Sequence, residues 1–423
     1  MKVLVIGSGG REHAIIKALK KNKRISQIYA APGNGGIRCD AQNAPVKALD
    51  IPAVADFAAQ NKIDYVVVAP DDPLAIGMVD SLEEKGIRCF GPNKAAARIE
   101  SSKVFAKDLM KKYSIPTASY EIFRDADKAA DYVKSGSISF PLVIKADGLA
   151  LGKGVTIAAD TGEALGAIDS VMRDKKFGAS GNSIVIEEFL TGPEVSVLAF
   201  TDGKTVKPMV SSMDHKRAFD GNTGPNTGGM GVIAPNPHYT DEIAAVCSEK
   251  IFLPTISAMR QESCPFKGCL YFGLMLTPKG PMVIEYNSRF GDPETQVVLP
   301  LLETDLLEIM EAVTDGKLAE INICWKDANA ACVVLASGGY PSSYKTGFTI
   351  NGLNDEGAAK NSEAVIYHAG TEYRDGIFCT SGGRVLGVTV VAKTLNTALD
   401  SAYKAASTIN FEGVHYRKDI GKY

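Results

Sequence analysis

The sequence predicts a multidomain protein of mixed α/β and α+β class, with an N-terminal doubly wound parallel sheet, two central α+β lobes and a small C-terminal α+β domain. Length is the first reason, because a chain of 423 residues is too long for one hydrophobic core. Secondly, strand-like apolar runs alternate with amphipathic helical stretches over the first hundred residues, which is typical of a parallel sheet. Thirdly, the last hundred residues carry separate short strands and one helix. We therefore expect three domains.

The first domain is expected over residues 1–102. Short apolar runs predict its strands, and apolar residues at helical spacing predict its helices. The expected strands are 3–6, 27–31, 65–69 and 88–91, and the expected helices are 11–21 and 74–85. Ligands of such sheets bind outside the carboxyl ends of the strands. Three loops rich in glycine or proline fall there, at 7–10, 32–36 and 70–73.

The second domain is expected over residues 103–325 and the third over residues 326–423. Glycine and proline at 91–92 mark the first boundary, because both interrupt regular structure before the helix predicted at 95–113. Within the second domain, 141–189 is expected to form a strand, a glycine loop, a strand, a helix and a strand, inside a mobile lobe at about 124–188. The other expected elements are a helix at 241–261, strands at 331–336, 364–369 and 384–391, and a helix at 394–407.

Composition indicates small-molecule partners. The 46 Lys and Arg residues nearly balance the 49 Asp and Glu residues, and a net charge of -3 gives no broad attraction to nucleic acid or acidic lipid. The sequence has no run of about 18 apolar residues, so no membrane span is predicted. The apolar stretch at the start of the sequence is too short for a signal peptide. Eight cysteines lack any Cys-x-x-Cys pair. We expect reduced cysteines and a cytoplasmic monomer without nucleic-acid or membrane partners.

The loop at 7–13 follows a strand and opens a helix, as a dinucleotide-binding fingerprint does. Glu12 stands at the third glycine position, so that fingerprint fails. What remains is a set of backbone amides at a helix N-terminus, with Arg11 beside them, which suits one phosphate group. A tight turn that simply requires glycine explains the loop equally well.

A second loop runs from Lys145 to Gly154, directly after a predicted strand. It is not a P-loop, because Gly154 stands where Ser or Thr should follow Lys153. A mobile loop of this kind, with Gly152 in it, can fold over a triphosphate while Lys145 and Lys153 neutralise its charge. A plain hairpin with a solvated lysine is the alternative.

Two further segments suit ligand contacts. A strand at 185–190 leads into a bend whose backbone can bond an adenine edge, and Glu194 follows at a distance suited to ribose hydroxyls. Most strands of this kind only contribute to the hydrophobic core and bind no ligand. The segment 214–231 joins Asp-His-Lys-Arg to a glycine-dense loop that lets backbone approach a ligand closely. We expect a binding or structural role for His215 rather than general-base catalysis.

The segment after 282 carries the most specific pattern. Strand alternation places Glu285 and Asn287 on one face. Two oxygen ligands, one of them anionic, suit a magnesium ion that also binds substrate phosphates. Arg289 lies two residues further and faces the same way if the strand continues, and its guanidinium suits a carboxylate or a transferring phosphoryl oxygen. A surface strand of salt bridges is the alternative.

The lysine–glycine loop, the bent strand and the Glu285–Asn287 pair, in that order, resemble the ATP-grasp enzymes, which hold ATP between two α+β lobes and activate a carboxylate as an acyl phosphate. Longer motifs over essentially the whole chain resemble the phosphoribosylamine–glycine ligase family. These motifs are GSGGREHA at Gly7, PGNGG at Pro32, KADGLALGKGV at Lys145, DHKR at Asp214, GPNTGGMG at Gly224, EYNSRFGDPETQ at Glu285, GGYP at Gly338 and RKDIG at Arg417.

The resemblance implies a purine-pathway ligase that uses ATP with Mg²⁺ or Mn²⁺ and joins glycine to 5-phosphoribosylamine through glycyl phosphate. Lys145 would balance charge on the transferred phosphoryl group, while Asp214 and Arg289 would hold the ammonium and carboxylate of glycine. The expected nucleotide contacts are Lys103, Lys145, Gly152, Lys153, Glu187, Leu190 and Glu194, with Leu190 acting through its backbone. The expected phosphoribosylamine contacts are Gly9, Gly10, Arg11, Gly33, Asn34 and Asp71.

Two departures from the family pattern stand out: Asp71 is one methylene shorter than the usual glutamate, and Asn222 replaces an aspartate. Compared with ATP-grasp enzymes more widely, the strand at 270–276 has no carboxylate for a further metal contact. A biotin-dependent or aminoimidazole-ribonucleotide carboxylase is the nearest rival, and a non-catalytic nucleotide-binding regulator is another. We expect one reaction, since no further enzyme follows Tyr423.

Overall fold

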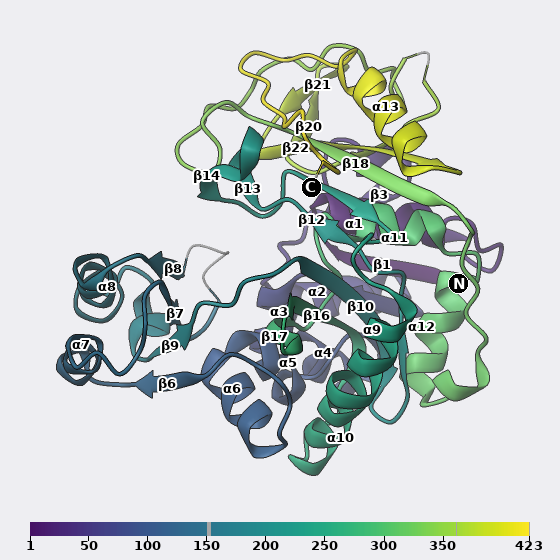
Figure 1. The fold of residues 1–423 in the computed structure, drawn as a ribbon. Coiled ribbons are helices and arrows are strands. Elements are labelled where there is room, and N and C mark those ends of the chain that lie inside the picture. Colours follow the sequence, from purple (N-terminus) through teal and green to yellow (C-terminus); the bar gives the residue numbers. More distant parts are fainter. Residues whose placement is uncertain (150–153, 361, 423) are drawn as a thin grey trace.

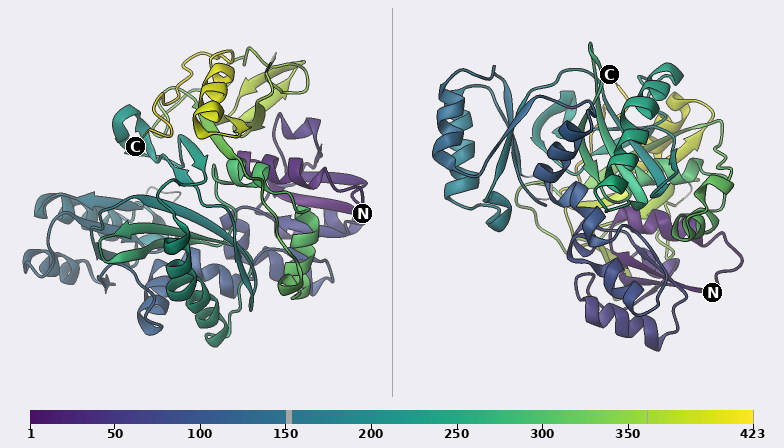
Figure 2. Two further views of the ribbon diagram at one scale, coloured as in Figure 1. Left: turned by 45° about the vertical axis from the view of Figure 1, so that its right-hand side comes forward. Right: turned by 90° about the horizontal axis from the view of Figure 1, so that it is seen from below.

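The structure is a computed structural model that describes residues 1–149, 154–360 and 362–422. The lobe containing α7 (Ala126–Lys134) and α8 (Thr161–Ile168) projects away from the rest of the molecule (Figures 1 and 2). Among the described residues, no helix is both long enough and apolar enough to cross a membrane.

The N-terminal sheet is parallel, as predicted, with the order β3-β2-β1-β4-β5. Its central strand β1 presents alternate residues to two cores: Val3 and Val5 pack with α1 and α12, whereas Leu4 and Ile6 pack with α2, α3 and α4. Helices therefore cover both faces, which confirms the doubly wound prediction. The strands are β1 Lys2–Gly7, β2 Gln27–Pro32, β3 Gln42–Asn43, β4 Tyr65–Val68 and β5 Cys89–Phe90, and the helices are α1 Gly10–Leu19, α2 Ile51–Gln60, α3 Asp71–Ile76 and α4 Met78–Glu84.

Two helices were predicted to be continuous, and both predictions were wrong, because each helix is divided in two. The one at 74–85 is interrupted at Gly77, whose φ of 94° ends α3 in the left-handed conformation before α4 begins. The one at 95–113 is split into α5 Lys94–Ser101 and α6 Lys103–Lys112. Ser102 separates them because its extended backbone and its hydroxyl, which accepts from the Phe105 amide, start a new helix.

Two antiparallel sheets build the central lobes. The projecting lobe has the strand order β6-β9-β7-β8 with α7 and α8, and the second sheet has the order β11-β10-β16-β17. The three strands and the helix predicted at 141–189 are confirmed, whereas part of the glycine loop predicted between the first two strands lies outside the described residues. The projecting lobe has β6 Tyr120–Phe123, α7 Ala126–Lys134, β7 Leu142–Ala146, β8 Val155–Ala158, α8 Thr161–Ile168 and β9 Ile184–Glu188; the second sheet has β10 Glu194–Asp202, β11 Val206–Pro208, β16 Lys267–Thr277 and β17 Gly280–Asn287.

The helix predicted at 241–261 is one helical run with a change of pitch. It comprises α9 Asp241–Cys247, a π-helical turn Ser248–Phe252 and α10 Leu253–Gln261. Pro254, at the start of α10, has no amide hydrogen to continue the α-helical hydrogen bonds, and the wider turn precedes it.

The C-terminal sheet takes two strands from the middle of the chain. Its order is β12-β15-β18-β22-β19, so that strands on either side of residue 325 lie in one sheet. Helix α13 covers it by packing on β18 and β22. The bounds are β12 Met213–Asp214, β15 Gly231–Ala234, β18 Asn329–Ala336, β19 Val365–His368, β22 Arg384–Ala392 and α13 Leu395–Ala406; the remaining elements are the hairpins β13 Arg217–Phe219 with β14 Thr223–Asn226 and β20 Thr371–Arg374 with β21 Ile377–Thr380, and the helices α11 Thr295–Leu301 and α12 Leu306–Asp315.

Candidate active site

A cavity of about 1290 Å³ lies between the N-terminal sheet, the central lobes and the C-terminal domain. Most of the predicted site residues line it: Arg11, Asp71, Lys103, Lys145, Glu187, Leu190, Glu194, Asp214, Glu285, Asn287 and Arg289. Four others, Gly9, Gly10, Gly33 and Asn34, lie outside its lining. Gly152 and Lys153 fall outside the described residues. The fold thus gathers predicted site residues that are far apart in the chain: Arg11 and Arg289 are separated by 278 positions.

Lys145 on β7 bridges the two central lobes. Its Nζ lies 2.9 Å from Glu187 Oε1 and donates to the Ile284 carbonyl at 3.0 Å. The second oxygen of Glu187 lies 2.8 Å from Nζ of Lys107 on α6. Burial raises the pKa of Glu187, but the two lysines outweigh it and the pKa is lowered. The Glu187 carboxylate is therefore ionised, with both oxygens close to lysines.

Lys103 begins α6 and holds the near end of the glycine loop. Its Nζ donates to the Gly148 carbonyl at 2.9 Å. Burial lowers the pKa of Lys103, while the neighbouring Glu285 opposes this shift. Because Lys103 and Lys145 face the same cavity, together they supply a positive wall.

Glu285 and Asn287 lie on one face of β17, as strand alternation predicted. They pair across the sheet with Gly273 and Tyr271 of β16, so the neighbouring strand offers no carboxylate there. Burial raises the pKa of Glu285, but Lys216 and other cations outweigh it, and the pKa is lowered. Glu285 is consequently an anion, and its side chain is 35% exposed towards the cavity.

The oxygen ligands fit a divalent cation that is bound largely by phosphate and water. Within 1–149, 154–360 and 362–422, no group of three or more His, Cys, Asp or Glu side chains is placed to hold a metal ion. Glu285 and the Asn287 carbonyl remain, and Asn287 also accepts from Arg289 at 3.1 Å. Hard oxygen ligands and few protein contacts are what Mg²⁺ prefers when it binds a nucleotide.

Arg289 joins the end of β17 to the N-terminal domain. Its Nη2 lies 3.0 Å from Glu100 Oε1 and 4.0 Å from Asp71 Oδ2. Glu100 also accepts from the amide and hydroxyl of Ser288, at 2.7 and 2.8 Å. Nε of Arg289 is buried and has no hydrogen-bond partner among the described residues. One guanidinium edge is thus fixed, while a donor remains for a ligand.

Asp214 on β12 is partly buried, and its carboxyl lies in an acidic neighbourhood. Burial, followed by the charge of Glu294, raises its pKa well above the ordinary value. Its Oδ1 has no hydrogen-bond partner in the described part of the chain. A Cβ at Gly229 would lie 2.5 Å from this oxygen, so a side chain there would displace it. The arrangement suits a small cation.

The two residues after Asp214 have different surroundings. His215 uses both ring nitrogens: Nδ1 bonds the Gly231 carbonyl at 3.1 Å and Nε2 accepts from the Gly421 amide at 3.0 Å. Burial lowers the pKa of His215 to about 4. A structural role fits this residue, as expected. Lys216 instead faces the cavity and lies 3.3 Å from Glu194 and 3.8 Å from Glu285.

The C-terminal domain closes one side of the cavity. Arg384 on β22 donates through Nη1 to the Asp292 carbonyl at 2.7 Å and to the Gly228 carbonyl, and its Nη2 lies 3.4 Å from Asp292 Oδ1. The hydroxyl of Tyr340 accepts from the Gly228 amide at 3.0 Å. The glycine-dense loop is therefore held by the C-terminal domain.

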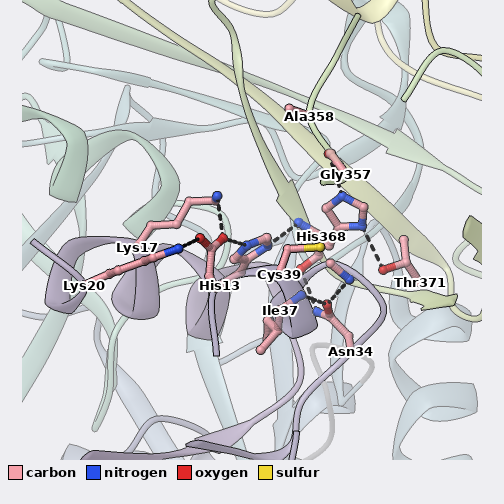
Figure 3. A network of polar contacts seen from close by, with 12 residues as sticks. His13, Lys17, Lys20, Asn34, Ile37, Cys39, Gly357, Ala358, His368 and Thr371 are labelled. Atoms are coloured by element: carbon pink, nitrogen blue, oxygen red, sulfur yellow. Dashed lines mark hydrogen bonds and ion pairs between the residues drawn. The ribbon is translucent and has the colours of Figure 1, made fainter. Parts of the chain in front are cut away.

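Asn34 ties the first domain to the last (Figure 3). Its amide nitrogen donates to the carbonyls of Ser8 and His368, both at 2.8 Å, and its oxygen accepts from Gly36 and Ile37, both at 2.9 Å. The side chain is therefore fully engaged in shaping its loop.

A second contact lies beside it (Figure 3). The His368 amide donates to His13 Nδ1 at 2.9 Å, while His13 Nε2 lies 3.0 Å from Asp40. His13 must therefore carry its proton on Nε2, where it donates to Asp40. Lys17 and Lys20 also bind Asp40, at 2.6 and 2.8 Å.

Models of three domains of phosphoribosylglycinamide synthetase match this chain, with the N domain over residues 1–100, the ATP-grasp domain over 101–295 and the C domain over 330–423. A phosphoribosylamine–glycine ligase of Caldanaerobacter subterraneus is 48% identical, over 99% of both chains. The chain belongs to the phosphoribosylamine–glycine ligase family.

Solved structures agree with this placement. The crystal structure of phosphoribosylamine–glycine ligase from Thermotoga maritima has a TM-score of 0.86 and 34% identity, over 99% of this chain and 100% of that one. The biotin carboxylase domain of the Hydrogenobacter thermophilus 2-oxoglutarate carboxylase, solved with MgADP and bicarbonate, has a TM-score of 0.72 at 18% identity, over 98% of this chain and 91% of that one. The second likeness concerns the fold alone. The family and the fold class expected from the motifs are both confirmed.

Several charged residues to which the sequence assigned no role also line the cavity, among them Glu100, Lys107, Glu294 and Arg384. Each lies within a helix or strand, or just before one, where charged residues usually face solvent. Their partners are distant in the chain, as with Glu100 and Arg289. Glu294 stood inside the quoted EYNSRFGDPETQ motif, which was the one available signal.

Proposed function

We propose that this chain, as a ligase of purine biosynthesis, joins glycine to 5-phosphoribosylamine in a single cavity, with conversion of ATP to ADP and phosphate. The observation that carries the proposal is the convergence of Lys145, Glu285, Arg289 and Asp214 on that cavity in a chain of this family. Together they offer a cationic wall, an anion suited to a metal ion, a guanidinium and a carboxyl oxygen that has no hydrogen-bond partner among the described residues.

The first chemical step would form an acyl phosphate. A carboxylate oxygen of glycine attacks the γ-phosphorus of ATP, the new oxygen–phosphorus bond forms as the bond to the β–γ bridging oxygen breaks, and ADP leaves. Mg²⁺ or Mn²⁺ on Glu285 and Asn287 would supply charge neutralisation for the phosphates. Lys103 and Lys145 face the same region, where fixed positive charge stabilises the transferring group.

The second step would form the amide. The amine of 5-phosphoribosylamine attacks the glycyl carbonyl carbon, the carbon–oxygen bond to phosphate breaks, and the nitrogen loses a proton as inorganic phosphate leaves. No side chain needs to form a covalent bond. Orientation within one closed cavity supplies much of the rate enhancement of such a step.

Glycine would be held at both ends. Its ammonium group suits Asp214, whose buried Oδ1 lacks a partner within the described ranges and whose pKa is raised by burial and by the charge of Glu294. Its carboxylate suits Arg289, which keeps the unpartnered Nε.

The nucleotide would lie between the two central lobes. Leu190, in the bend after β9, lines the cavity, and its backbone would contact the adenine; Glu194 on β10 lines the cavity as well. The predicted contacts of Gly152 and Lys153 complete this set on sequence grounds. Glu187 would act through its lysines, because its own oxygens lie against Lys107 and Lys145.

Phosphoribosylamine would enter from the N-terminal sheet. Arg11 and Asp71 reach the cavity from the carboxyl ends of β1 and β4. Gly9, Gly10 and Gly33 would offer backbone contacts beside them, and Asn34 would hold their loop in shape through its bonds to Ser8 and His368.

A phosphate-release assay tests the proposal. With ATP, Mg²⁺, glycine and freshly prepared 5-phosphoribosylamine, phosphate release is expected only when all are present. Bicarbonate in place of glycine is expected to give none. Release that depends on bicarbonate would favour a carboxylase, and nucleotide binding without any release would favour a regulator.

A further inference from the structure

Lys107 is a buried lysine of the central domain. It lies in the middle of α6, and only 3% of its surface is exposed. Its Nζ lies 2.8 Å from Glu187 Oε2 and donates to the Thr117 hydroxyl at 2.8 Å, and the Tyr120 ring centroid is 5.3 Å away. The Thr117 hydroxyl in turn donates to the Val283 carbonyl at 2.7 Å. The ammonium group is thus held by three elements of the chain.

The contacts continue from Lys107 to the predicted phosphate end of the cavity. Glu187 links Lys107 to Lys145, and Lys145 donates to the carbonyl of Ile284, the residue before Glu285. The three charged side chains carry a net charge of +1. Without Lys107, Glu187 would neutralise Lys145 completely and one of its buried oxygens would lose its cation. A buried carboxylate left in this way is costly.

We propose that Lys107 is a positioning residue, which holds Glu187 so that Lys145 stays aimed at the ATP phosphates with one uncompensated positive charge. The inference rests on the proposed ATP-dependent reaction and deepens it. Lys107 acts through Glu187 and does not itself touch the reacting atoms.

Several ionisable groups face Lys107. They are Glu187 and Glu188 on β9, Lys145 on β7 and Tyr120 on β6. Burial lowers the pKa of Lys107 to about 8, and Glu187 opposes this shift. Lys107 is therefore charged at neutral pH but lies close to the point at which it loses its proton.

The test uses the full chain and the variants Lys107→Met, Lys107→Arg and Lys107→Met with Glu187→Gln. Lys107→Met is expected to raise both the KM for ATP and the dissociation constant of Mg·ADP by about 10- to 100-fold, the range of one charge-assisted hydrogen bond. The KM values for glycine and phosphoribosylamine should stay within about twofold. Lys107→Arg should recover most of the lost affinity, since it restores the charge.

The double variant separates positioning from direct contact. It restores the net charge of +1 through Lys145 alone and leaves no buried carboxylate unpaired, so it should bind Mg·ADP more tightly than Lys107→Met. It also remains informative if the single variant fails to fold. Lys111→Met, on the exposed side of the same helix, is the control and should match the parent chain.

Two outcomes would overturn the inference. One is a double variant that binds Mg·ADP no better than Lys107→Met, which would indicate direct contact with the nucleotide. The other is a lower melting temperature with unchanged ATP and ADP constants, which would indicate a purely structural lysine. Because Mg·ADP affinity is measured without turnover, failure of the proposed reaction in the parent chain would be recognised separately.

Discussion

At the scale of single residues, the cavity holds charged groups that keep capacity for a ligand. Glu285 is partly exposed, and Lys216 lies 3.8 Å away. Asp214 has a pKa raised by burial and by Glu294, and one of its oxygens has no hydrogen-bond partner in the described chain. A carboxyl whose pKa is raised in this way favours ligand binding at a cost in stability.

Glu285→Ala is expected to abolish phosphate release while leaving the fold intact. The weak contact with Lys216 implies that the free energy of unfolding changes by less than about 1 kcal/mol. Activity and chemical denaturation measure the two effects. Glu303→Ala removes an exposed carboxylate elsewhere and should change neither. A folded Glu285→Ala protein with near-full activity would contradict the metal assignment.

Asp214→Asn is expected to lose glycine binding and gain stability. In the folded chain the pKa of Asp214 is raised, so ionising it at neutral pH opposes folding, and that opposition grows as pH rises above the ordinary carboxyl pKa. The neutral amide removes this opposition. We expect the KM for glycine to rise at least about 100-fold, with a higher melting temperature at pH 7. A lower melting temperature would show that Asp214 is a favourable ion-pair partner in the free protein.

Arg11→Ala is expected to raise the half-saturating concentration of phosphoribosylamine much more than that of ATP. Arg11 lines the cavity from α1 and donates to the Phe290 carbonyl at 3.1 Å, on the side of the N-terminal sheet. Steady-state kinetics with each substrate varied in turn measures the difference. Equal effects on both substrates would remove Arg11 from the proposed phosphoribosylamine site.

At the scale of elements, local sequence predicted where helices and strands occur better than where they break. The helix pattern at 74–85 passes through Gly77 without interruption, since glycine is tolerated in helices, and only its φ of 94° reveals the break. The pair Glu285 and Asn287 was predictable because both members lie in one strand. The roles of Lys107 and Arg384 were not predictable, because their charged or polar partners are distant in the chain. Glu187 lies 80 positions from Lys107, and Asp292 lies 92 positions from Arg384.

The break at Gly77 gives two glycine substitutions opposite expected effects. Gly77→Ala should lower the free energy of unfolding by about 1 kcal/mol, because alanine resists the left-handed conformation even though its Cβ would meet only ordinary contacts. Gly166→Ala, within α8 and facing open space, should raise it by about 0.5–1 kcal/mol. Urea denaturation measures both. A stabilising Gly77→Ala would mean that α3 and α4 can join as one helix.

At the scale of the whole molecule, the cavity depends on strands that are distant in sequence. The short strands β12 and β15 extend the C-terminal sheet and carry Asp214 into the cavity beside β17. Strands of two and four residues in a glycine-rich segment give almost no periodic signal, so their pairing was not predictable. Neutral histidines also join distant segments: His13 contacts His368, and His215 contacts Gly421.

These histidines predict that stability falls as the solution is acidified from pH 6.5 towards pH 4.5. Burial lowers the pKa of His13, His215 and His368 in the folded chain, so the unfolded chain binds more protons below the ordinary histidine pKa of 6.5. Stability is therefore fully present above that pH and is lost below it, by up to about 1.4 kcal/mol per pH unit for each histidine. Asp214 and Glu100, whose pKa values are raised, take up protons on folding and reduce the net slope.

Denaturation at several pH values measures that slope, and replacing one histidine isolates its share. His215→Gln removes one group that takes up a proton when the chain unfolds. The slope of the unfolding free energy against pH, between pH 4.5 and 6.5, should therefore be smaller by as much as about 1.4 kcal/mol per pH unit, whatever the variant's own stability. Carboxylates with lowered pKa, such as Asp40 and Asp292, lose their contribution at lower pH and do not share this window. An unchanged slope would mean that His215 is protonated in the folded chain, which would contradict its bond with the Gly421 amide, since only an unprotonated Nε2 can accept.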